Sequence, residues 1–154
     1  MSLKNFSWVV PSKLSGSSMP KCTGEESDIE WLADQGVRTL VSLTLPQGPV
    51  EEICGRSGLA WIYFPIPDFG VPRKSDEFAS LVEELVTSIQ SEKPVCVHCH
   101  AGIGRTGLVL SCVLGKLFSL SPWSAISAVR KVRPAIETSE QENFIQQFLR
   151  DYEN

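Results

Sequence analysis

The sequence predicts a single α/β domain in three layers, with a mainly parallel central sheet flanked by helices on both faces. Short apolar runs typical of buried strands alternate along the chain with segments whose apolar residues recur at helical spacing. The 154 residues match the size of one domain, and no internal repeat, low-complexity tract or linker divides them. We therefore expect residues 1–154 to form one unit.

The first half of the chain predicts a helix, a strand, a loop and a second strand. The helix is expected from about Glu25 to Gln35, with Gly36 as its stop. A strand follows over Val37–Leu45 and then a loop containing glycine and proline over Pro46–Gly58. The second strand is expected over Leu59–Ile66.

The second half predicts four helices around one more strand. Ser75 is expected to cap the first helix, and Val95–Val97 forms the strand. A helix runs onward from Arg105, and Ser121 with Pro122 opens the next one. The residues expected to pack the core are Phe78, Leu81, Val82, Leu85 and Ile89, then Leu108, Val109, Cys112, Val113 and Phe118, and in a last helix Phe144, Ile145, Phe148 and Leu149.

The segment between the Val95–Val97 strand and the following helix has the composition of a phosphate cradle. It places Gly102 and Gly104 where tight turns and close backbone approach are needed. A loop that opens onto a helix N-terminus presents unpaired N–H groups and the positive end of the helix dipole. We expect the residues from His100 to Arg105 to bind a phosphate dianion.

The same segment contains a nucleophile and the groups that would serve it. The field of the helix N-terminus favours Cys99 as a thiolate, which can attack phosphorus. Arg105 offers a planar fork that binds two phosphate oxygens at once, which lysine cannot do. Thr106 is close enough in sequence to donate its hydroxyl to the thiolate, and His98 is expected to order the loop rather than transfer protons.

Hydrolysis of a phosphomonoester also needs an acid that protonates the leaving oxygen. Asp68 is the best candidate, because it lies in a proline- and glycine-shaped loop directly after a predicted strand. Taken alone, a Pro-Asp pair is also ordinary turn chemistry. The cysteine motif favours the catalytic interpretation.

These residues carry a family resemblance. The run His98-Cys99-His100-Ala101-Gly102-Ile103-Gly104-Arg105-Thr106-Gly107 matches the His-Cys-x5-Arg-[Ser/Thr]-Gly signature of cysteine-dependent protein tyrosine and dual-specificity phosphatases. The chain also resembles the small atypical, VHZ-like members over nearly its whole length. Further support comes from residues 5–11, from Ile66–Pro72, and from Arg133-Pro134 through Glu140-Gln141-Glu142.

The resemblance implies a protein tyrosine phosphatase-like fold and metal-independent, cofactor-free hydrolysis through a phosphocysteine. Asp68 matches the family's general acid on a loop that can move, and Gln141 matches a glutamine that orients the hydrolytic water. A capping box explains Gln141 equally well, with Thr138 paired to Gln141 or Ser139 paired to Glu142. The implied substrates are phosphotyrosine and also phosphoserine or phosphothreonine in proteins or peptides.

Other functions remain open at this point. Cys96 and Cys99 form a Cys-x-x-Cys pair that could belong to a zinc site, to a redox couple or to a regulatory disulfide. No second paired spacing supplies further zinc ligands, so we expect no metal and treat Cys96 as a buried strand residue. A phosphoinositide phosphatase, an RNA 5′-phosphatase and a phosphate-dependent binding module are the remaining alternatives.

Net charge and composition limit the kinds of partner that we expect the chain to bind. The formal net charge of −4 and a pI near 5.2 argue against bulk attraction to nucleic acid or to a membrane surface. Phosphate recognition would then depend on local charge, for which Arg73, Lys74, Arg130, Lys131 and Arg133 could form a rim. Five cysteines and no evident signal peptide predict a reducing compartment, the cytoplasm, with the nucleus as a second site in a eukaryote. We expect a monomer.

Overall fold

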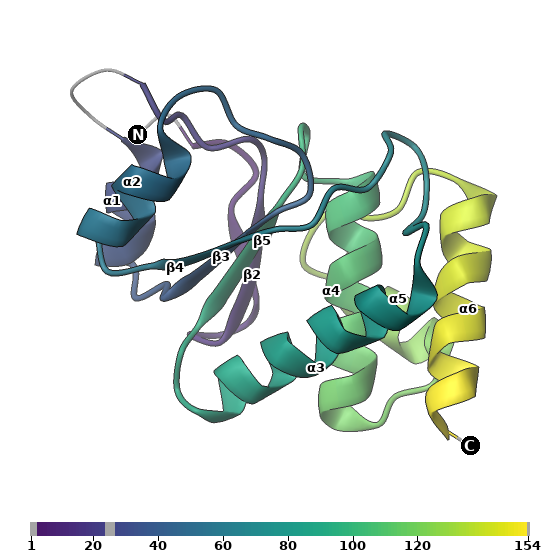
Figure 1. Cartoon of the computed structure of the whole chain (residues 1–154). Helices are drawn as coiled ribbons and strands as arrows, with labels where there is room; N and C mark the ends of the chain where they lie inside the picture. Colours follow the sequence, from purple (N-terminus) through teal and green to yellow (C-terminus); the bar gives the residue numbers. More distant parts are fainter. Residues whose placement is uncertain (1–2, 24–26, 154) are drawn as a thin grey trace.

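The structure is a computed structural model that describes residues 3–23 and 27–153 of the chain. Its centre is a five-stranded sheet formed by β1 (Ser7–Val10), β2 (Leu14–Ser17), β3 (Thr39–Ser42), β4 (Ala60–Tyr63) and β5 (Val95–His98). The strand order is β1-β2-β5-β3-β4, and only β1 with β2 is antiparallel. Figure 1 shows helices on both faces of this sheet. The predicted three-layer, mainly parallel fold is confirmed.

The N-terminal hairpin was not anticipated from the sequence. Strand β1 pairs with β2 through a bulge between Trp8 and Val10, and β2 then joins β5 in parallel. β2 contributes only four residues, and two of them are serines. The strand is nevertheless fully buried, because it lies between β1 and β5. Such a short, partly polar strand carries little periodic signal.

Two short helices cover one face of the sheet. Helix α1 (Asp28–Asp34) begins after Ser27, whose Oγ accepts from the Ile29 amide at 3.1 Å. The expected start at Glu25 lies outside the described residues. The prediction of a plain loop over residues 46–58 is wrong, because this stretch contains α2 (Val50–Arg56). Val50, Ile53 and Cys54 recur at helical spacing and are buried in the core on this face.

Four longer helices form the other layer: α3 (Ser75–Gln90), α4 (Gly104–Phe118), α5 (Pro122–Arg130) and α6 (Ser139–Glu153). The predicted apolar face of α3 is buried, and Ser121 caps α5 through its Oγ. Two expectations are wrong here. Ser75 is the first helical residue rather than the cap, and Phe118 is 53% exposed because it ends α4 beyond the core.

Helix α4 is the central element of this layer, since its first twelve residues are all buried. It packs between the sheet and helices α3, α5 and α6. Its N-terminus follows directly from the carboxyl end of β5, where parallel sheets place their ligands. The fold therefore holds the end of α4 rigidly at the site predicted from the motif.

No single helix in the described residues is long and apolar enough to cross a membrane. Helices α4 and α5 meet such a criterion only when taken together, and they are bent by 120° where they join.

Candidate active site

The predicted nucleophile lies at the floor of the loop between β5 and α4. Cys99 follows the last residue of β5 and is 3% exposed. The hydroxyl of Thr106, from the first turn of α4, donates to Cys99 Sγ at 3.1 Å. The predicted contact between these two residues is therefore present. It supplies a hydrogen bond that favours negative charge on the sulfur.

The carbonyl groups of residues 99–103 all accept hydrogen bonds from the protein around the loop. The His98 ring bonds the carbonyl of residue 99 at 3.0 Å, and the Met19 amide donates to that of residue 100 at 2.9 Å. Asn5 Nδ2 donates to the carbonyls of residues 101 and 102. The amides of Gly107 and Ile136 donate to that of residue 103, at 2.9 and 3.0 Å.

The amide groups of the same loop are left without partners. Within the described part of the chain, the N–H groups of residues 100–105 donate to no other residue, and no side chain caps α4. Six consecutive donors that are free while the neighbouring carbonyls are bonded are a donor set suited to binding an anion. The predicted phosphate-binding set, His100, Ala101, Gly102, Ile103, Gly104 and Arg105, is this loop.

Two glycines allow the loop to lie close to the neighbouring backbone. Gly102 has a φ of +79°, and a Cβ on it would lie 2.5 Å from the Ser17 carbonyl oxygen. A Cβ on Gly104 would overlap the Glu137 carboxylate and lie 3.1 Å from Gln141 Nε2. Any larger residue would displace the loop. Glu137 was not singled out from the sequence, because nothing in its local pattern shows that it lies against the loop.

A chain of hydrogen bonds fixes the imidazole of His98. Trp61 Nε1 donates to Ser42 Oγ at 2.9 Å, and Ser42 Oγ lies 2.6 Å from His98 Nε2. Because a carbonyl only accepts, His98 Nδ1 carries the proton that bonds Cys99 O, so Nε2 accepts from the serine hydroxyl. Burial, together with the smaller effect of the Arg105 charge, lowers the pKa of His98 to about 4, although the hydrogen bond to the Cys99 carbonyl acts in the opposite direction. His98 is therefore neutral at pH 7 and bonded to a carbonyl of the loop, and its role in ordering the loop stays a prediction.

Arg105 and Asp68 form an ion pair beside the phosphate loop. Arg105 is 7% exposed in its side chain, and its Nη1 donates to the Ile66 carbonyl at 3.1 Å. Its Nη2 lies 3.3 Å from Asp68 Oδ1, and the Asp68 side chain is 63% exposed. The structure thus brings the predicted acid and the predicted phosphate-binding arginine together. Because Asp68 lies on an exposed loop, its carboxyl can reach a bound substrate.

The Asp68 loop has a constrained backbone. Phe69 adopts a φ of +59° and is 57% exposed, and its amide donates to Asp68 Oδ1 at 3.0 Å. The Gly70 amide donates to the Pro67 carbonyl at 2.8 Å, which closes a turn around the aspartate. A bulky residue held at positive φ costs about 1 kcal/mol or more, and such strain often marks a functional segment.

Gln141 connects this loop to α6. Its Nε2 donates to the Gly70 carbonyl at 3.2 Å, and its Oε1 accepts from the amides of Glu137 and Thr138. The backbone N–H of Gln141 in turn donates to Thr138 Oγ1 at 3.1 Å. Of the two capping boxes that the sequence allows, the structure therefore forms the one between Thr138 and Gln141. Gln141 is fully buried, and its role toward water stays a prediction.

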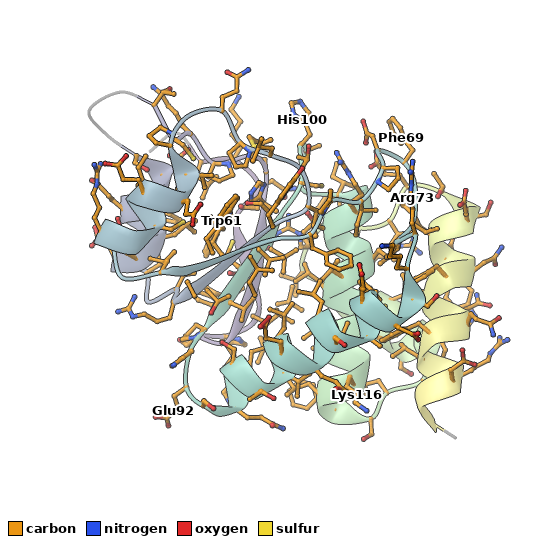
Figure 2. All side chains as sticks on the ribbon, in the orientation of Figure 1. Trp61, Phe69, Arg73, Glu92, His100 and Lys116 are labelled. Atoms are coloured by element: carbon orange, nitrogen blue, oxygen red, sulfur yellow. The ribbon has the colours of Figure 1, made fainter. Side chains whose placement is uncertain are left out.

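The predicted basic rim is wrong for Arg133. Arg133 is 3% exposed and lies behind the phosphate loop, where Nη2 donates to the Gly102 carbonyl at 2.7 Å. Arg130 donates to the Ala135 carbonyl at 3.0 Å. Arg73 and Lys74 are exposed and line a groove of about 500 Å³ beside the Asp68 loop. In the view of Figure 2, the labelled side chains of Phe69 and His100 project from the upper edge of the molecule, and Arg73 is drawn below Phe69.

The cysteines outside the loop have no sign of metal or redox pairing. All five cysteines of the chain, Cys99 included, are free thiols, and Cys96 is fully buried in β5 as predicted. Burial raises the pKa of Cys96, so this thiol stays neutral. Among residues 3–23 and 27–153, no three His, Cys, Asp or Glu side chains gather in a way that could hold a metal ion.

Comparison with known proteins decides the family. Residues 3–145 match the family model described as Swiss Army Knife protein, DSP-PTPase phosphatase domain. The chain belongs to this family. Its members carry the dual-specificity and tyrosine phosphatase domain whose signature the phosphate loop matches.

Individual relatives agree with this membership. The chain is 37% identical over 94 residues to cyclin-dependent kinase inhibitor 3 of Rattus norvegicus, covering 59% of this chain and 44% of the relative. It is 38% identical over 96 residues to tyrosine-protein phosphatase non-receptor type 18 of Mus musculus, covering 54% and 20%. The chain thus spans less than half the length of these curated relatives.

The structures of two phosphatases are also similar. The active form of Tk-PTP superposes with a TM-score of 0.81 at 26% identity, covering 95% of this chain and 97% of the other. Kinase associated phosphatase superposes with a TM-score of 0.80 at 24% identity, covering 99% of this chain and 95% of the other. This second likeness shows the fold.

Proposed function

We propose that this DSP-PTPase domain hydrolyses phosphotyrosine, and also phosphoserine or phosphothreonine, in proteins or peptides through a phosphocysteine intermediate. One observation carries the proposal: six amides are free to bind a dianion in the loop that follows a thiol, and this thiol accepts a hydrogen bond from Thr106. A donor set of this kind stabilises the charge on the equatorial oxygens of a phosphoryl group during transfer. The similarity to a tyrosine-protein phosphatase supports protein substrates.

The first half-reaction transfers the phosphoryl group to sulfur. The substrate's phosphate binds the loop amides and Arg105, where it replaces Asp68 as the partner of the guanidinium. The Cys99 thiolate attacks phosphorus, the bond from phosphorus to the leaving oxygen breaks, and Asp68 gives its proton to that oxygen. The products are an alcohol or phenol and phosphocysteine.

The second half-reaction returns the thiolate. Asp68, now a carboxylate, takes a proton from water as the water oxygen attacks phosphorus and the bond to sulfur breaks. Thr106 stabilises the departing thiolate through the hydrogen bond already present at 3.1 Å. Gln141 is placed next to the Asp68 loop through Gly70, which supports the prediction that its amide orients the attacking water.

The loop residues favour phosphoproteins over other phosphomonoesters. His100 and Ile103 occupy positions where inositol phosphate-directed relatives often carry lysine, and the chain is acidic overall. The acidity also disfavours an RNA 5′-phosphatase, because nucleic-acid binding depends on basic surface. We further propose that the domain acts in the cytoplasm as a monomer, without metal or cofactor.

The test is phosphate release from an aryl phosphate at about pH 6 in the presence of a chelator. We expect turnover in the wild type, none in Cys99→Ser, and a loss of about 100-fold in Asp68→Asn. Asp76→Asn is the matched control, since Asp76 is an exposed aspartate in the first turn of α3 and should leave the rate unchanged. Turnover that survives Cys99→Ser in folded protein would refute the mechanism.

The substrate class is tested separately by comparing phosphopeptides, inositol phosphates and 5′-phosphorylated RNA. We expect phosphotyrosine peptides to have the highest kcat/KM. Cys99→Ser should still bind them, because the loop amides and Arg105 are intact. Wild type that binds a phosphopeptide without releasing phosphate would indicate a binding module.

A further inference from the structure

Arg133 is a buried cation without a carboxylate partner. The guanidinium is 3% exposed, and the ion pairs found among the described residues do not include it. Its partners are neutral: Nη1 donates to the Gly16 carbonyl at 2.5 Å and to Ser7 Oγ at 2.9 Å, and Nη2 to the Gly102 carbonyl at 2.7 Å. Its Nε has no partner in the described structure.

A buried charge of this kind is costly unless an opposite charge compensates it. Burial lowers the pKa of Arg133, and the neighbouring thiols Cys96 and Cys99 oppose that effect when they are ionised. Cys96 is held neutral by its burial in β5. The thiolate of Cys99 is therefore the anion that can balance Arg133 in the resting site, and a bound phosphate adds to it.

The sequence makes room for this arginine at one position in particular. A Cβ on Gly16 would lie only 2.9 Å from Arg133 Nη1, so the glycine in β2 is what lets the guanidinium reach the strand. From there the planar fork spans β1, β2 and the phosphate loop at once. Lysine could carry the charge but could not direct three hydrogen bonds in this geometry.

We propose that Arg133 is a positioning residue of the catalytic centre, which turns the Gly102 carbonyl away from the pocket and stabilises the negative charge of the Cys99 thiolate from behind the loop. This inference rests on the proposed function of the loop as a thiolate-based phosphate site. The two arginines then have different roles: Arg105 contacts the substrate, whereas Arg133 does not. Both support the same anion from different sides of the loop backbone.

The experiment measures the pH dependence of Cys99 alkylation by iodoacetamide, read by peptide mass spectrometry. Wild type is compared with Arg133→Gln, which keeps a donor but no charge, and with Arg133→Lys, which keeps the charge. We expect the alkylation midpoint to move up by about one pH unit in Arg133→Gln and to stay near wild type in Arg133→Lys. Inhibition by inorganic phosphate should weaken about tenfold in both variants, because neither holds the Gly102 carbonyl as arginine does.

Arg130→Gln is the matched control, since this arginine also bonds a carbonyl but lies at the end of α5. Its midpoint and phosphate inhibition should match wild type. An unchanged midpoint in folded Arg133→Gln, or an equal shift in Arg130→Gln, would overturn the proposal. If Arg133→Gln does not fold, unchanged phosphate inhibition in Arg133→Lys overturns it. Alkylation of Cys99 needs no turnover, so it can be measured even if the protein has no phosphatase activity. A shifted midpoint in an inactive protein would support this inference while the proposed function fails.

Discussion

The buried imidazole of His98 makes the stability of the domain depend on pH. Its pKa is about 4 in the folded protein and 6.5 in an unfolded chain, so the unfolded state binds more protons between these values. The stabilisation that neutral His98 contributes is therefore fully present above about pH 6.5 and is lost as the pH falls toward 4. Between pH 7.5 and pH 5 the two pKa values correspond to a loss of about 2 kcal/mol in the free energy of unfolding.

The assay is urea denaturation at both pH values for wild type and His98→Asn, whose amide does not titrate. His100, the other histidine of the chain, is exposed and is common to both proteins. We expect the difference in free energy of unfolding between wild type and variant to shrink by about 2 kcal/mol at pH 5. A difference that stays constant within about 0.5 kcal/mol would show that burial does not keep the His98 ring neutral in the folded protein.

Three further predictions concern the loop and its supports. Thr106→Val should slow hydrolysis of phosphocysteine about tenfold or more. In rapid-quench experiments the alcohol or phenol product should then appear in a burst, whereas a linear time course would contradict the prediction. Gly102→Ala should lower the free energy of unfolding by at least about 2 kcal/mol in thermal denaturation. Gly36→Ala is the control, because Gly36 has a φ of +99° but open space around it, so this variant measures the cost of the backbone conformation alone and should be destabilised less. Gln141→Leu should lower kcat more than it raises KM, because it frees the Asp68 loop, and an unchanged kcat would exclude both that anchoring role and the role toward water.

Local chemistry explains what the sequence predicted well. The nucleophile, the phosphate-binding arginine and Thr106 lie within eight residues of one another, so strand, loop and helix rules place them without knowledge of the rest of the fold. Likewise Gly36, Ser121 and the face of α3 depend on neighbours a few positions away. Such features are encoded within one or two turns of chain.

What the sequence did not predict depends on contacts across the fold. Arg133 has the pattern of a solvated charge near a helix end, and only the closeness of Gly16 and Gly102 in space shows that it is buried. In the same way, only the closeness of Glu137 to Gly104 in space shows that Glu137 lies against the loop. Helix α2 was missed because two prolines and two glycines flank it and Gly55 lies within it. Its buried face forms only against the second core cluster.

The phosphate loop is assembled from pieces that are far apart in the order of synthesis. Asn5 bonds two of its carbonyls, and the amides of Met19 and Ile136 bond one each, across as many as 97 residues of sequence. A growing chain that has just emerged with its complete signature motif consequently lacks the support from residues 133–141. The catalytic segment therefore does not take its final shape on its own. The shape is completed late, when residues 133–141 dock, and ribosome-bound chains halted before residue 133 should fail to bind phosphate.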